Sequence, residues 1–136
     1  MATHRHLLDQ AQIHPAVRDK IATYQRDLVD EVRAAVAKND VVVVGMSQNP
    51  APRRACRLLK QKNIPFTYLQ YGSYLSLWRR RLALKMWTGW PTFPMIFVKG
   101  VMVGGADDLA KLEASGELAK MLAAPRSEGE PLARDN

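Results

Sequence analysis

The chain has a single cysteine, Cys56, among its 136 residues. An intramolecular disulfide needs two thiols, so a disulfide-stapled fold is excluded. No second thiol is present to resolve a mixed disulfide on the same chain, which excludes ordinary dithiol redox chemistry. Low cysteine content is compatible with any compartment, and a cytoplasmic location is the default expectation.

Long apolar runs are missing as well. No stretch approaches the roughly 20 apolar residues that a transmembrane helix needs. The first 14 residues carry charges and histidines in place of the continuous apolar segment of a secretory signal. His4 and His6 have no third metal ligand at a suitable spacing, so we expect no metal site.

The charge is unbalanced: 20 Lys and Arg against 13 Asp and Glu give a formal net charge of +7. Such a surface suits an anionic partner, whether nucleic acid, an acidic protein, acidic lipid or a small carboxylate, and it is equally compatible with a solvated basic surface. Net charge alone does not identify a site, so a nucleic-acid ligand is not expected. With 47% hydrophobic and 24% charged residues, the composition is that of one globular domain.

The first half of the chain predicts a helix followed by a strand–helix–strand unit. We expect residues 1–14 to be flexible and one helix to run from His14-Pro15 to about residue 38. Its apolar residues recur every three or four positions, at Val17, Ile21, Tyr24, Leu28, Val32 and Val36. Residues 41–44, four valines, predict a strand buried on both faces. A helix capped by Asn49 then leads to about residue 63, and residues 66–69 predict a second strand parallel to the first.

The second half predicts a helix, a hairpin and a last helix. Residues 74–87 form the helix, with Leu75, Trp78, Leu82 and Met86 expected on its buried side. Strands at 95–98 and 101–103 are joined by a turn at 99–100. Asp107 or Asp108 caps a helix to about residue 122, and residues 124–136 are expected to be disordered. The domain is therefore 15–123, an α/β fold with a four-stranded mixed sheet and one extra helix in front.

Two motifs lie in register with these elements. Residues 90–94 (Trp-Pro-Thr-Phe-Pro) precede the third strand, and residues 104–108 (Gly-Gly-Ala-Asp-Asp) follow the fourth. Together they resemble the glutaredoxin family, which places Thr-x-Pro with a cis proline and Gly-Gly-(Cys/Ser)-Asp at these points. The sequences of residues 28–46 and 90–94 resemble the monothiol, iron–sulfur-associated branch of the family. The resemblance covers about 28–122 and implies the thioredoxin fold, βαβ-α-ββα, with a cis Phe93–Pro94 bond.

The chain departs from the family at the redox cysteines. In the family the first cysteine lies nine residues before a paired apolar couplet, here Leu58-Leu59, which puts it at Asn49 and the second position at Pro52. Neither residue can supply the thiolate for disulfide exchange or iron–sulfur ligation. Cys56 lies about 10 Å farther along the helix, where the helix dipole no longer lowers a thiol pKa. We interpret it as a packing residue, and expect a degenerate active site without a catalytic residue.

The resemblance also implies a groove for glutathione. The Phe93 backbone would pair with the cysteinyl part, the helix start at Asp107 and Asp108 would hold the γ-glutamyl end, and Arg81 and Lys85 would hold the glycyl carboxylate. The full set of ligand-binding candidates is Arg81, Lys85, Thr92, Phe93, Pro94, Gly105, Ala106, Asp107 and Asp108. The lysine that the monothiol branch carries after its first strand is missing, because residues 46–48 are Met-Ser-Gln.

Three functional hypotheses follow. The leading one is a non-catalytic glutaredoxin-like binding or regulatory protein, whose ligand is glutathione, an extended peptide with a carboxylate, or a protein. An acidic partner would meet the basic helix surface of Arg79, Arg80 and Arg81. The alternative is a glutathione-dependent thiol–disulfide oxidoreductase or electron-transfer protein of cell redox homeostasis that uses Cys56. Association with nucleic acid or acidic membranes is a third, and it rests on charge alone.

Overall fold

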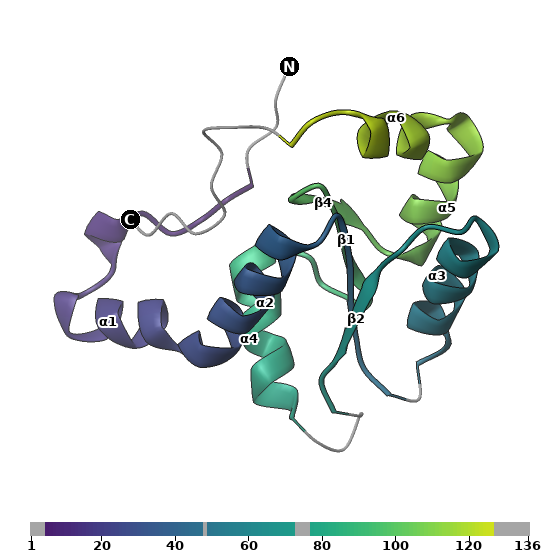
Figure 1. Ribbon diagram of the computed structural model, residues 1–136. Helices are drawn as coiled ribbons and strands as arrows, with labels where there is room; N and C mark the ends of the chain where they lie inside the picture. Colours follow the sequence, from purple (N-terminus) through teal and green to yellow (C-terminus); the bar gives the residue numbers. More distant parts are fainter. Residues whose placement is uncertain (1–4, 48, 73–76, 127–136) are drawn as a thin grey trace.

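Four strands form one mixed sheet in the order β2-β1-β3-β4 (Figure 1). The computed structural model describes residues 5–47, 49–72 and 77–126. The strands are β1 (Val41–Gly45), β2 (Thr67–Gln70), β3 (Met95–Val98) and β4 (Val101–Gly104). β1 pairs in parallel with β2 and antiparallel with β3, and β3 and β4 form the hairpin. The predicted α/β fold with a four-stranded mixed sheet is confirmed.

Helices cover both faces of this sheet. They are η1 (Gln10–Gln12), α1 (Pro15–Thr23), α2 (Arg26–Lys38), α3 (Pro50–Gln61), α4 (Trp78–Thr88), α5 (Ala106–Ser115) and α6 (Glu117–Ala123). Figure 1 shows α2 and α4 together on one face, α3 and α5 together on the other, and α1 extending away from the sheet. No helix within the described ranges is long and apolar enough to cross a membrane.

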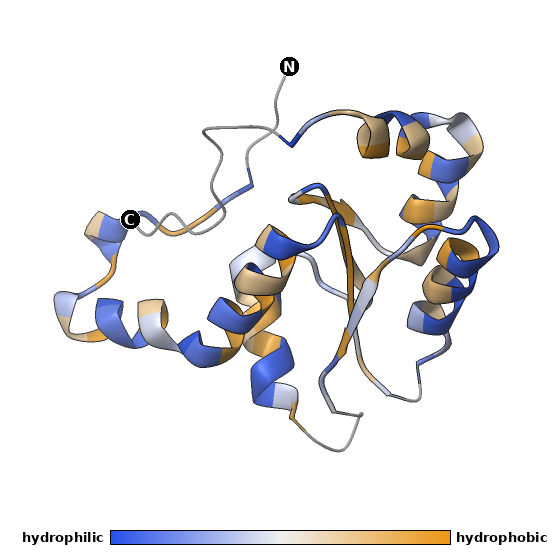
Figure 2. Ribbon diagram, in the orientation of Figure 1, coloured by the Kyte–Doolittle hydropathy of each residue, from blue (hydrophilic) through white to orange (hydrophobic). Residues whose placement is uncertain are grey.

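Strand β1 lies at the centre of the hydrophobic core. All five of its residues are buried, as expected of a strand covered on both faces. Val42 and Val44 face one side of the sheet, where they pack in a cluster with residues of α2, α4 and β3. Val41 and Val43 face the other, in a cluster that includes residues of α3, α5 and α6. Figure 2 shows the hydrophobic strands inside and hydrophilic residues on the outer faces of the helices.

The leading helix differs from the prediction, because the expected single helix is two. The break lies at Tyr24 and Gln25, and Gln25 adopts a left-handed backbone with φ of 50°. The apolar stripe continues through the break in the sequence, but only α2 buries its part of it. Val17 and Ile21 of α1 are exposed. The last helix is also divided, at Gly116 with φ of 82°, a conformation that glycine adopts without steric cost.

The buried side of α4 was predicted wrongly. Its inward residues are Arg81, Ala83 and Leu84, whereas Trp78, Leu82 and Met86 are exposed. Leu75 and Tyr74 lie outside the described residues. The helix carries apolar residues on two faces, and periodicity alone does not say which face meets the sheet.

The segment after α6 is tied to α2. Arg126 donates from Nη1 to the Val36 carbonyl at 3.2 Å and from Nη2 to the Asn39 carbonyl at 3.0 Å. These are carbonyls at the C-terminal end of α2, which have no partner within the helix. The sequence predicted a disordered tail over residues 124–136 and did not predict this contact. Residues 127–136 lie outside the described ranges.

Candidate functional site

Asn49 connects the start of α3 to the loop before β3. As the N-cap, it accepts the Ala51 N–H on Oδ1 at 3.1 Å. Its Nδ2 donates to the Phe93 carbonyl at 3.2 Å, across 44 residues of sequence. The predicted cap is confirmed, and the bond to Phe93 was not predicted. The residue at the expected cysteine position is thus a structural bridge that contains no sulfur.

Pro52 fills the space beside the end of β1. It is buried in the first turn of α3, where the lack of an N–H costs little. A Cβ added to Gly45 would lie 2.9 Å from Cβ and Cγ of Pro52 and 3.1 Å from the Tyr68 ring. The close approach of the proline ring therefore requires glycine at position 45, and Pro52 acts in packing.

Cys56 is half-buried beside the core between α3 and the sheet. Burial raises the pKa of its thiol, and the positive charge of Lys60 offsets only part of this effect. A raised pKa leaves less thiolate at neutral pH, and the thiolate is the nucleophilic form. The geometry agrees with the interpretation of Cys56 as a packing residue.

Phe93, Pro94 and Lys85 come together at the loop before β3. The Phe93–Pro94 peptide bond is cis, as predicted. Phe93 and Pro94 are buried, whereas Thr92 is exposed. Lys85 Nζ lies 5.8 Å from the centre of the Phe93 ring, within the range of a cation–π contact. Arg81 and Lys85 were the two basic residues expected to hold a carboxylate, and Lys85 is the one that lies beside Phe93.

Arg81, the other basic residue expected to hold a carboxylate, makes a hydrogen bond within the protein. It is 7% exposed and donates to the Tyr71 carbonyl at 3.1 Å. Tyr71 in turn donates its hydroxyl to Glu31. Burial, followed by this hydrogen bond and the Glu31 charge, raises the pKa of Tyr71. Arg81 is therefore not part of the exposed basic surface on which the sequence placed it.

The start of α5 holds the two predicted aspartates in different roles. Asp108 accepts the Gly105 N–H at 3.0 Å, so its carboxylate caps the helix. A Cβ on Gly104, whose φ is +105°, would lie 2.6 Å from that carboxylate. Asp107 is exposed and forms an ion pair with Arg54 of α3 at 3.0 Å. Arg54, which the sequence analysis did not predict as a site residue, thus lies beside the γ-glutamyl side of the predicted groove. Its only signal in the sequence is its place five residues after Asn49.

The rest of the basic surface on α4 is partly paired. Arg80 contacts Asp27 of α2 at 3.1 Å, and the hydrogen bond lowers the pKa of that carboxyl. The pair is exposed to solvent and contributes little to stability. The Arg79 guanidinium lies 4.8 Å from the centre of the Trp78 ring. Among the described residues, no cluster of His, Cys, Asp or Glu could hold a metal ion, and His4 falls outside them.

The segment after β1 offers no cation in place of the family lysine. Met46 is buried, and the backbone N–H and hydroxyl of Ser47 both donate to the Gly72 carbonyl, at 2.7 and 2.9 Å. Gln48 lies outside the described residues.

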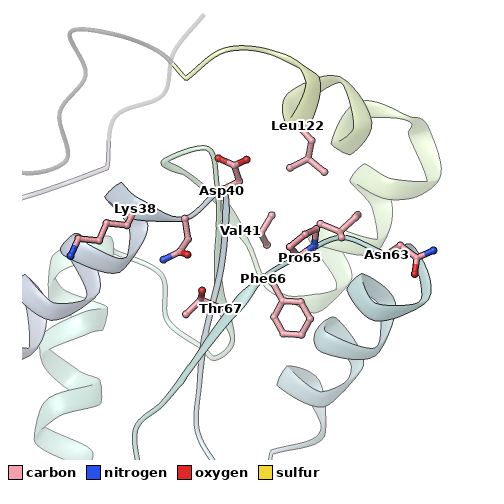
Figure 3. A pocket seen from close by; sticks show the side chains of 10 residues that line it. Lys38, Asp40, Val41, Asn63, Pro65, Phe66, Thr67 and Leu122 are labelled. Carbon is pink, nitrogen blue, oxygen red and sulfur yellow. The ribbon is translucent and has the colours of Figure 1, made fainter.

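A separate hollow of about 530 Å³ lies at the opposite end of β1 and β2, lined by Asp40, Phe66, Thr67, Leu122 and their neighbours (Figure 3). None of the predicted ligand-binding residues lines it.

Comparisons with known proteins agree with this geometry. A protein-family model described as Glutaredoxin matches residues 41–103. The chain is 40% identical over 118 residues to a glutaredoxin-like protein of Dictyostelium discoideum, covering 87% of this chain and 94% of that protein. The chain belongs to the glutaredoxin family.

The monothiol branch is among its relatives. A mitochondrial monothiol glutaredoxin-5 of Schizosaccharomyces pombe is 31% identical over 114 residues, covering 77% of this chain and 78% of that protein. Oxidized glutaredoxin 2 of Chlamydomonas reinhardtii superposes with a TM-score of 0.63 at 28% identity, covering 72% and 92% of the two chains. A buckwheat glutaredoxin–glutathione complex superposes with 0.62 at 21% identity, covering 77% and 92%. This glutaredoxin-family chain thus has the predicted fold, and its only cysteine is Cys56.

The packing role of Pro52 leads to a double-mutant prediction. Gly45→Ala lowers the free energy of unfolding by about 1–3 kcal/mol, because the new Cβ overlaps the proline ring. In a Pro52→Gly background the same substitution costs less, by at least about 0.5 kcal/mol, since the proline atoms are gone and only the Tyr68 ring stays close. Urea unfolding followed by tryptophan fluorescence measures all four variants. Equal costs in the two backgrounds would contradict the contact.

Proposed function

We propose that this glutaredoxin-family protein is a non-catalytic binding protein, which retains the family groove for glutathione or an extended peptide with a carboxylate. One observation carries the proposal. The side chain at the expected cysteine position is an amide that bonds both to the first turn of α3 and to the Phe93 carbonyl. A regulatory or carrier role by binding is consistent with this arrangement, and disulfide exchange is not.

Thiol chemistry has no suitable group at the groove. Disulfide exchange needs a thiolate, which the N-terminal end of a helix normally stabilises. At that end stands Asn49, and Cys56 lies farther along α3 with a raised pKa. The alternative of a Cys56-dependent oxidoreductase would require this half-buried thiol to become exposed, and no observed contact favours it.

Several described groups support a groove that does not depend on sulfur. A carbonyl oxygen has two lone pairs, so the Phe93 carbonyl can accept a ligand N–H besides the Asn49 amide. Lys85 stands above the Phe93 ring, where its ammonium can meet a ligand carboxylate. The N-terminal end of α5 suits a second carboxylate, and exposed Asp107 suits an ammonium group. Support for the ligand class comes from the buckwheat neighbour, which was solved as a glutathione complex.

One prediction of this proposal concerns disulfide-exchange activity. In a glutathione-dependent mixed-disulfide assay, the wild-type protein and Cys56→Ser should show the same background rate, because neither places a thiolate at the start of α3. A turnover that rises with pH and disappears in Cys56→Ser would contradict the proposal. Such a pH profile would identify the Cys56 thiolate as the nucleophile.

The second prediction concerns binding. Titration with reduced glutathione should shift the amide NMR signals of Phe93 and of Gly105 to Asp108. Lys85→Ala should weaken binding roughly ten- to a hundredfold, the worth of one charge-assisted hydrogen bond. Lys120→Ala, which removes an exposed lysine of α6, serves as the matched control and should bind as the wild type does. Shifts confined to residues outside the loop before β3 and the start of α5 would show that the groove is only inherited scaffold.

A further inference from the structure

An apolar groove lies between α1 and α4, and its lining contains none of the residues of the candidate glutathione site. Its hollow has a volume of about 210 Å³ and is lined by Val17, Lys20, Ile21, Tyr24, Leu82 and Met86. All of these side chains are apolar or aromatic except Lys20. They come from two helices that are far apart in the sequence but meet along this line.

The groove consists of the two apolar stripes whose periodicity predicted burial. Exposed fractions are 40% and 48% for Val17 and Ile21, and 39% and 47% for Leu82 and Met86. Trp78 and Leu77 extend the exposed apolar surface at the start of α4. Single exposed apolar residues are ordinary, but a contiguous set that lines a hollow is typical of an interaction site.

The surroundings of the groove are positively charged. On α4, Arg79 is exposed and Arg80 is partly exposed, and the helix has no acidic residue. α1 contains Arg18 and Lys20 against Asp19. Lys20 lies in the groove itself, and Arg79 stands over the Trp78 ring at its edge. The Arg80 charge is already matched by Asp27. Among the described residues, Lys20 and Arg79 are therefore the basic residues beside the apolar strip that have no carboxylate partner.

We propose that this groove binds an amphipathic helix of an acidic partner protein. Apolar side chains spaced three or four residues apart on the partner would enter between α1 and α4, as in other helix-in-groove complexes. Carboxylates flanking them would meet Lys20 and Arg79, which speeds association and selects against basic partners. The inference is independent of the glutathione groove, since none of its lining residues belongs to that site.

Charge and shape favour this occupant over two others. A second copy of the chain would bring the same basic surface and a net charge of +7 toward the first, which is repulsive. A bilayer surface suits apolar side chains that project from one helix face, whereas these residues come from two helices and form a shallow, open groove.

A displayed peptide library tests the proposal. Helical peptides carry fixed leucines at positions i, i+4 and i+7, and their other positions are randomised among Glu, Gln and Lys. Selection against the wild-type protein should enrich Glu over Lys. The affinity of the selected peptides should fall about tenfold or more in Met86→Glu and in Lys20→Glu, since each removes a central contact. Val101→Glu, an equally exposed apolar residue of β4, is the matched control and should bind normally.

Three results would overturn the proposal. The first is a peptide selection that enriches nothing, that enriches Lys over Glu, or that gives the same enrichment with Met86→Glu as with the wild-type protein. The second is binding to phosphatidylserine vesicles that Met86→Glu abolishes, in place of peptide enrichment, which would assign the groove to a membrane surface. The third is a dimer in sedimentation that Met86→Glu dissociates, which would assign it to a second copy.

Discussion

The side-chain amide of Asn49 joins the two segments on which the candidate groove depends. Its oxygen begins α3 by accepting the Ala51 N–H, and its nitrogen holds the carbonyl of Phe93 before the cis proline. Sulfur is only a weak hydrogen-bond donor and acceptor, so a thiol at this position could not form the same bridge. Under the proposed function, Asn49 at the expected cysteine position thus supplies no nucleophile and forms two hydrogen bonds.

The hydrogen bonds of Asn49 and the packing of Pro52 both favour the folded state. An Asn N-cap is worth about 0.5–2 kcal/mol relative to Ala, and a further net hydrogen bond about 0.5–1.5 kcal/mol. Pro52, at the second expected position of the motif, packs its ring on Gly45. Catalytic sites often sacrifice stability for function. In the proposed binding protein, the two positions expected for the cysteine pair contribute to stability instead. Phe93, Lys85 and the start of α5 are the elements of the proposed groove.

The sheet could be predicted from the sequence because its signals are local. Four consecutive valines, the Asn49-Pro50 helix start and the turn at 99–100 each specify their own element. Errors arose where the answer depends on what a residue meets: the buried face of α4, the exposed stripe of α1, and the burial of Arg81 against the Tyr71 carbonyl. The bond from Asn49 to Phe93 and the pair of Arg54 with Asp107 also join distant segments, so no local pattern announces them.

The central claim is that a glutaredoxin groove persists around a position that has lost its sulfur. Its most direct test restores the thiol with Asn49→Cys in a Cys56→Ser background and measures reaction with glutathione disulfide by mass spectrometry. The thiolate attacks one sulfur, forms a mixed disulfide and releases one glutathione. The account predicts one glutathionyl adduct, formed at least about tenfold faster than on Ala114→Cys, an exposed α5 position in the same background. A folded Asn49→Cys variant that reacts no faster than this control would contradict the account.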